Sequence, residues 1–189
     1  MIGKIFITRH GYDPARGRHI KDPFLGDTPS IGACQPRLRK KLQKGDHLFV
    51  ISGRAKGLEQ FVLGGFEVER KISQLEAYEQ FPEQRLHERA DGQLAGNVIV
   101  DHTGKQHPLD DHTNFENRTE DYIVGSNPIA LVSDTEIMRG REETLEALQE
   151  ILKKSGRRPI DIVGRGGATL NEKQIEGLRY WLARLKDVA

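Results

Sequence analysis

The sequence has few of the residues that stabilise small secreted or metal-bound folds. Its 189 residues include one cysteine, Cys34, which excludes an internal disulfide framework and a zinc site made of several cysteines. No apolar run approaches the roughly 18 residues of a membrane-crossing helix, and the first residues do not follow the plan of a signal peptide. A composition of 36% apolar and 30% charged residues is typical of a soluble globular domain. We therefore expect one cytoplasmic domain over residues 1–189, with no membrane partner.

Positive and negative residues are nearly equal in number, with 29 Lys or Arg and 28 Asp or Glu, but they are unevenly distributed along the chain. Residues 1–56 contain 12 Lys or Arg against 4 Asp or Glu, whereas residues 57–123 contain 6 against 14. The net charges of these two blocks are therefore +8 and −8. One interpretation is a polarised molecule with a face for an anionic partner, and the other is mutual neutralisation of the blocks across the fold.

The first half of the chain is expected to hold strands, a long loop and one short helix. Apolar, β-rich runs predict strands over residues 4–8, 47–52 and 61–70, and the pair Gly64-Gly65 predicts a bulge in the last of these. Glycines and prolines recur through residues 9–34, so this stretch is predicted to be a loop, and loops of that length are commonly functional. Pro36 at a first helical position predicts a helix over residues 36–42.

The second half of the chain is expected to be richer in helix. Capping boxes at residues 73–76 and 169–172 predict helices that end near residues 82 and 186, and an apolar stripe predicts a third over residues 141–154. Strands are predicted at residues 97–100, 123–124, 129–133 and 160–163. Strands and helices do not alternate regularly, which favours an α+β fold: a small mixed β-barrel flanked by short helices and a C-terminal helix.

Three features are candidates for binding an anion. The predicted helix carries Arg37, Arg39, Lys40, Lys41 and Lys44, which we expect to point outward and attract phosphates. The turn Ser52-Gly53-Arg54, at the end of a predicted strand, and the turn Arg165-Gly166 combine small residues with a guanidinium group. The simpler interpretations, a solvated helix face and two ordinary loops, stay open.

The long loop contributes aromatic rings beside cations. Tyr12 and Phe24 could stack on a base while Arg9 holds a phosphate, or both rings could anchor the loop in the core. His102, His107 and His112 lie near Asp101, Asp110 and Asp111, but no helical pair of histidines occurs among them. Solvated loop residues are the better interpretation, so we expect no metal and no cofactor.

One motif favours an enzyme. Thr8-Arg9-His10-Gly11 after a first strand, followed by Ser52-Gly53-Arg54-Ala55, resembles the start of the histidine phosphatase family. In that family a nucleophilic histidine attacks phosphorus between two arginines, which here would be His10 between Arg9 and Arg54. The family also has a second histidine after a late strand, whereas this sequence has Asp134 there. A phosphomonoesterase is therefore the alternative function.

A wider stretch resembles another family. The segments Phe24-Leu25-Gly26, Gly32 to Arg39, Lys44 to Gly53, Val62 to Val68 and Phe81-Pro82, with Gly164 to Gly167 before a helix containing Trp181, are similar to the nucleotide modification associated domain, type 2, of bacteria and phages. The resemblance implies a fold related to the PUA-like barrels, including the EVE and ASCH groups. It also implies a module that binds DNA or RNA, including a modified base or nucleotide, rather than an enzyme.

The resemblance implies a particular pocket and rim. By matching position, these would be formed by Cys34, Pro36, Arg37, Arg39, Ser52, Gly53, Arg54, Arg165 and Gly166. Arg9, Tyr12, Phe24 and Lys40 join them as candidates from the residues themselves. The sequence therefore predicts a nucleic-acid-binding module with no catalytic residues, in which distant segments converge on one cationic hollow.

Overall fold

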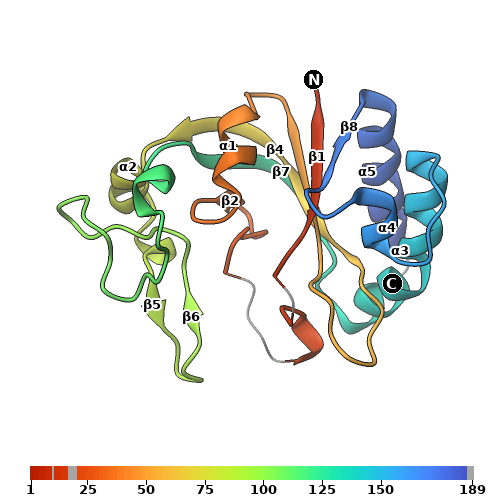
Figure 1. Cartoon of the computed structure of the whole chain (residues 1–189), viewed down its shortest axis with the longest axis horizontal. Coiled ribbons are helices and arrows are strands. Elements are labelled where there is room, and N and C mark those ends of the chain that lie inside the picture. Colours follow the sequence, from red (N-terminus) through yellow and green to blue (C-terminus); the bar gives the residue numbers. More distant parts are fainter. Residues whose placement is uncertain (10, 17–20, 187–189) are drawn as a thin grey trace.

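A curled, six-stranded sheet forms the centre of the computed structural model, which describes residues 1–9, 11–16 and 21–186 (Figure 1). In sheet order its strands are β2 (Ser30–Ile31), β7 (Tyr122–Ala130), β4 (Val62–Ile72), β3 (His47–Ile51), β1 (Gly3–Ile7) and β8 (Ala168–Leu170). β1 and β3 are parallel, and the other neighbouring strands are antiparallel. The α+β half-barrel agrees with the predicted class of fold.

Helices flank the sheet on two sides. α3 (Asp134–Leu152), α4 (Pro159–Val163) and α5 (Glu172–Lys186) lie together at one side of Figure 1. α2 (Gln74–Gln80) lies at the other side with the hairpin of β5 (His87–Glu88) and β6 (Leu94–Ala95), and α1 (Pro36–Lys41) lies between the two groups. Single turns of 3-10 helix occur at η1 (Pro14–Arg16), η2 (Pro82–Gln84) and η3 (Phe115–Arg118).

The main core forms around β3, whose five residues are all buried. Phe49 and Ile51 belong to the same apolar cluster as Leu148 of α3 and Leu182 of α5. A strand that is covered on both faces should read as a continuous apolar run, which is why this strand was predictable from the sequence. Bulges in β4 at Gly65/Glu67 and Val68/Arg70 agree with the predicted irregularity near its two glycines.

Helix caps explain where two predictions were wrong. Ser133 was predicted to end a strand, but it accepts a hydrogen bond from the Glu136 amide and caps α3, which begins seven residues earlier than expected. Thr169 was predicted to cap the last helix, but it lies in β8. Asn171 and Gln174 form the reciprocal cap instead, each side chain accepting from the other residue's amide at 3.0 Å.

Two further segments that were predicted to be strands have another structure. Residues 160–163 form α4, because Pro159 occupies a first helical position and an apolar run of four residues fits either structure. Residues 97–100 are fully buried but make only isolated bridges. Val98 and Val100 pack with Tyr122 and Val124 in a second, smaller core cluster.

Burial of His47 makes stability depend on pH. The side chain is 6% exposed, its Nδ1 atom has no partner, and burial, followed by the Arg179 charge, lowers its pKa, against opposing effects of Glu67 and Asp46. Protonation thus favours the unfolded chain, in which the pKa is about 6.5. We expect the free energy of unfolding to fall as pH decreases through 6.5.

Replacing His47 with phenylalanine should remove the part of the pH dependence of unfolding that is due to His47. The ring stack on Phe49 persists in this variant, but the titrating group is lost. Urea denaturation between pH 7.5 and 5 measures the effect, and the exposed His102→Phe variant is the control. An identical pH dependence in His47→Phe and the wild type would contradict the assignment.

Candidate nucleic-acid interface

Three strands end at the same edge of the sheet. β1 and β3 are parallel, and β7 runs in the same direction as β3 because both are antiparallel to β4. β8 begins at this edge, since it runs antiparallel to β1 with Ala168 opposite Ile5. Turns at the carboxyl ends of parallel strands are where α/β sheets commonly bind ligands. Two predicted segments lie in the turns after β1 and β3, and a third lies in the turn before β8.

The turns that follow β1 and β3 form one unit. The Gly11 amide donates to the Arg54 carbonyl at 2.9 Å, and the Gly53 amide donates to the Tyr12 carbonyl at 2.8 Å. Gly53 lies so close to the first turn that a Cβ atom built on it would be 2.0 Å from the Arg9 carbonyl oxygen. Only glycine permits this approach, so the backbone fixes Arg9 and Arg54 relative to each other.

Gly53→Ala should therefore separate the two turns. We expect a loss of about 2 kcal/mol of stability, as for other overpacked sites, because the clash is with backbone rather than with a flexible side chain. Gly166→Ala is the matched control, since nothing lies within 4 Å of its Cβ position. Urea denaturation compares the two variants, and equal stability would mean that the turns are not held together at Gly53.

Three arginines extend from this edge into solvent. Arg9 follows β1, Arg54 follows β3, and Arg165 lies in the Gly164–Gly167 turn that leads into β8. All three are exposed, and none of their guanidinium groups has a hydrogen bond or ion pair with another described residue. Because β8, β1 and β3 are neighbours, these arginines come from adjacent strands. We call the following set the carboxyl edge: Arg9, Tyr12, Ser52, Gly53, Arg54, Arg165 and Gly166.

A buried ion pair attaches the first turn to α3. The Asp13 carboxylate, 1% exposed, accepts from both terminal nitrogens of Arg141 at 2.6 and 3.0 Å and from the Ala15 amide. Arg141 also donates to the Glu59 carbonyl, and its guanidinium lies 4.5 Å from the centre of the Phe61 ring. The Arg141 side chain thus connects α3 with the loop that follows β1 and with the loop that follows β3. No local pattern indicates this role, because Arg141 occupies an ordinary polar position of an amphipathic helix.

The remaining predicted site residues lie elsewhere. Phe24, Cys34, Pro36, Arg37, Arg39 and Lys40 belong to the segment from residue 21 through α1, which leads into the amino end of β3. The structure therefore divides the thirteen predicted residues into the seven of the carboxyl edge and these six. Ser52 is buried and accepts from the Phe61 amide at 3.1 Å, so it contributes to the shape of the edge rather than to its surface.

Arg39 was expected to point outward, and this is wrong. It is fully buried and donates to the carbonyls of Cys34, Glu120 and Asp121 at 3.0, 2.8 and 2.8 Å. These carbonyls compensate for the loss of water around the guanidinium, whose pKa is lowered mainly by burial. Arg39 therefore joins α1 to the segment before β7 and is not available to a ligand.

Asp22 organises the loop that precedes α1. Its buried carboxylate accepts from the amides of Gly32, Ala33 and Cys34, and from the Asn97 side chain at 3.1 Å. Burial, together with the Asp22 charge, raises the pKa of the Cys34 thiol well above its usual range. A protonated thiol is a poor nucleophile. Cys34 therefore has a structural role in the loop rather than a reactive one.

Ion pairs give little neutralisation between the two charged blocks. Among the described residues, with Lys56 left aside, no ion pair joins a Lys or Arg of residues 1–56 to an Asp or Glu of residues 57–123. Cations of the later helices are paired, as in Arg184 with Glu143 and Lys186 with Glu136. The polarised interpretation of the charge pattern is therefore the one that the contacts favour.

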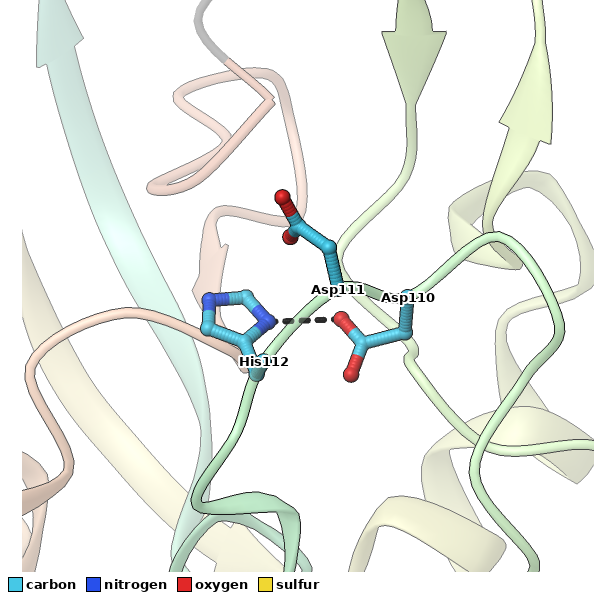
Figure 2. Close-up of side chains that lie close together, drawn as sticks. All are labelled: Asp110, Asp111 and His112. Carbon is cyan, nitrogen blue, oxygen red and sulfur yellow. Dashed lines mark hydrogen bonds and ion pairs between the residues drawn. The ribbon is translucent and has the colours of Figure 1, made fainter.

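The histidine-rich loop places three potential ligands together, as Figure 2 shows. Asp110, Asp111 and His112 have donor atoms within 4.8 Å of one another, whereas His102 and His107 are not in this group. His112 Nδ1 already contacts Asp110 Oδ1 at 2.6 Å, and Gln106 donates to the other carboxylate oxygen. These contacts engage Asp110 and one ring nitrogen of His112 within the loop, so the group by itself gives no argument for a metal.

Among residues 1–9, 11–16 and 21–186, no helix combines the length and hydrophobicity of a bilayer crossing. Searches of protein-family models, of curated proteins and of solved structures return no match for this chain.

Proposed function

We propose that this protein binds nucleic acid at the carboxyl edge, with Arg9, Arg54 and Arg165 contacting phosphates. The observation that carries the proposal is that three exposed arginines, whose guanidinium groups have no partners among the described residues, lie on turns of adjacent strands. Each guanidinium offers a planar fork that matches phosphate geometry and can also stack on a base. The half-exposed Tyr12, whose carbonyl accepts from the Gly53 amide, adds an aromatic ring to the turn that also contains Arg9.

The proposal also includes which ligands the protein prefers. The resemblance to the nucleotide modification associated domain and the PUA-like barrels suggests that the base beside Tyr12 is a modified one. Phosphate contacts would give affinity that does not depend on sequence, and the stacked base would give selectivity. A modified and an unmodified oligonucleotide of equal length should then differ in affinity but not in the salt dependence of binding.

Fluorescence polarisation of a labelled twelve-nucleotide strand tests the basic proposal. We expect binding at 50 mM salt that weakens steeply as salt increases, with a slope of about −0.7 per phosphate contacted. The charge-matched variants Arg54→Glu and Arg157→Glu should differ, because Arg157 is an exposed residue between α3 and α4 that does not belong to the carboxyl edge. Equal affinity of the two variants, or no binding by the wild type at low salt, would contradict the proposal.

One observation favours a phosphomonoesterase as the second candidate. The two motif segments meet in space, and Asp134, the first residue of α3, lies at the same edge of the sheet. His10, the nucleophile of this hypothesis, lies outside the described residues. Hydrolysis of p-nitrophenyl phosphate should then disappear in His10→Ala and fall strongly in Arg54→Ala. Absence of hydrolysis by the wild type would remove this candidate and leave the binding proposal standing.

A further inference from the structure

A second basic surface runs along α1. Arg37, Lys40, Lys41 and Lys44 are spaced as i, i+3, i+4 and i+7, so the three that lie in the helix share one side of it. All four are exposed, and none of their side-chain nitrogens has a partner among the described residues. We call these four residues the α1 face.

The rotation of α1 about its axis is fixed from the opposite side. Arg39 is fully buried, with hydrogen bonds to three backbone carbonyls, and Leu42 is buried in the main core. The helix therefore has no freedom to turn its cations toward a carboxylate of the fold. Repulsion among these cations opposes helix formation. Arg37 adds to this effect, because a cation in the first turn lies at the positive end of the helix dipole. A bound polyanion would reduce both unfavourable interactions.

The turn after α1 holds the end of this face at the amino end of β3. The Gly45 amide donates to the Val68 carbonyl at 2.8 Å, and the Asp46 carboxylate accepts from the amides of Ile2 and Gln43 at 2.8 Å each. Lys44 precedes β3 and Arg54 follows it, with nine residues between them, of which five form β3. Those five residues alone span about 17 Å along the strand.

We infer that the partner is a nucleic-acid strand long enough to contact both the carboxyl edge and the α1 face. This inference rests on the proposed function and specifies its ligand: an oligonucleotide rather than a mononucleotide. Successive nucleotides of a stacked strand rise about 3.4 Å, so about five rises cover the length of β3 and contacts at both ends need about six nucleotides. Cations at both ends of β3 would then neutralise phosphates of one continuous strand.

A length series separates this inference from the proposed function. Thymidine monophosphate and oligothymidylates of 3, 6, 9 and 12 nucleotides are titrated against the wild type and against Lys40→Glu/Lys44→Glu. We expect affinity of the wild type to rise at least tenfold between three and nine nucleotides. The double variant should lose that gain while it binds the trinucleotide nearly as the wild type does, and its salt slope for the 12-mer should be smaller by about 1.4.

The control is Lys153→Glu/Lys173→Glu, which changes the net charge equally at exposed positions outside both surfaces. Equal losses in the two double variants, or equal losses for short and long strands, would overturn the inference and indicate general electrostatics. Wild-type affinity that is the same for three and twelve nucleotides would also overturn it, with the proposed function intact. No binding at any length would reject the proposed function itself.

Discussion

Asp22→Ala should lower the free energy of unfolding by about 3–6 kcal/mol. The substitution leaves the amides of Gly32 and Ala33, at 2.9 and 3.0 Å from the carboxylate, and that of Cys34 without an acceptor in a buried loop. Each unsatisfied buried donor costs about 1–3 kcal/mol. Such a loss is a large fraction of the 5–15 kcal/mol that stabilises an ordinary domain.

Urea denaturation measures this effect, and two further variants keep the prediction testable if Asp22→Ala does not fold. Asp22→Asn retains one acceptor oxygen and should cost less than the alanine variant. Asp27→Ala changes an exposed carboxylate in the same loop and should leave stability within about 0.5 kcal/mol. Equal stability of Asp22→Asn and Asp27→Ala would contradict the role assigned to Asp22.

The second large effect concerns binding. Reversing the charge of all three arginines, in Arg9→Glu/Arg54→Glu/Arg165→Glu, should weaken binding of a twelve-nucleotide strand at least 100-fold at 50 mM salt. Three lost phosphate contacts should also reduce the salt slope by about 2. The arginines are exposed and have no partners among the described residues, so the triple variant should fold normally.

The matched control is Lys153→Glu/Arg157→Glu/Lys173→Glu, which produces the same net charge from exposed residues that do not belong to the carboxyl edge. Polarisation titrations at several salt concentrations compare the two triple variants with the wild type. An equal loss of affinity in both would attribute binding to overall charge, and no particular edge of the sheet would then be the site.

Local elements were predictable where one signal dominated. The continuous apolar run of β3 and the capping box of α2 both specify their structures, and the structure contains both. Residues 160–163 were not predictable from apolar character alone, because four such residues suit a strand or a helical turn and the tertiary packing decides. Arg39 was misjudged for a related reason: a charged residue can be buried when carbonyls from distant segments surround it, and the sequence does not indicate that they will.

The members of the candidate site could be named from the sequence, but their arrangement could not. Arg54 and Arg165 were identified from small residues beside a guanidinium group, and Arg9 from a loop with aromatic rings. That they lie on turns of adjacent strands follows from the sheet order β8-β1-β3, which chain order does not reveal. The ion pair of Asp13 with Arg141 joins residues 128 positions apart, and neither residue has a local pattern that indicates the other. Supporting contacts of this kind become visible only in the folded chain.

The side-chain Nε–Hε resonances of the arginines provide the most direct test of where nucleic acid binds. In a titration of the labelled protein with a six-nucleotide strand, we expect the signals of Arg9, Arg54 and Arg165 to shift together and saturate with one Kd. The signal of Arg157 should stay in place. Shifts of Arg157 as large as those of the three arginines, or saturation of the protein with all three signals unmoved, would contradict binding at the carboxyl edge.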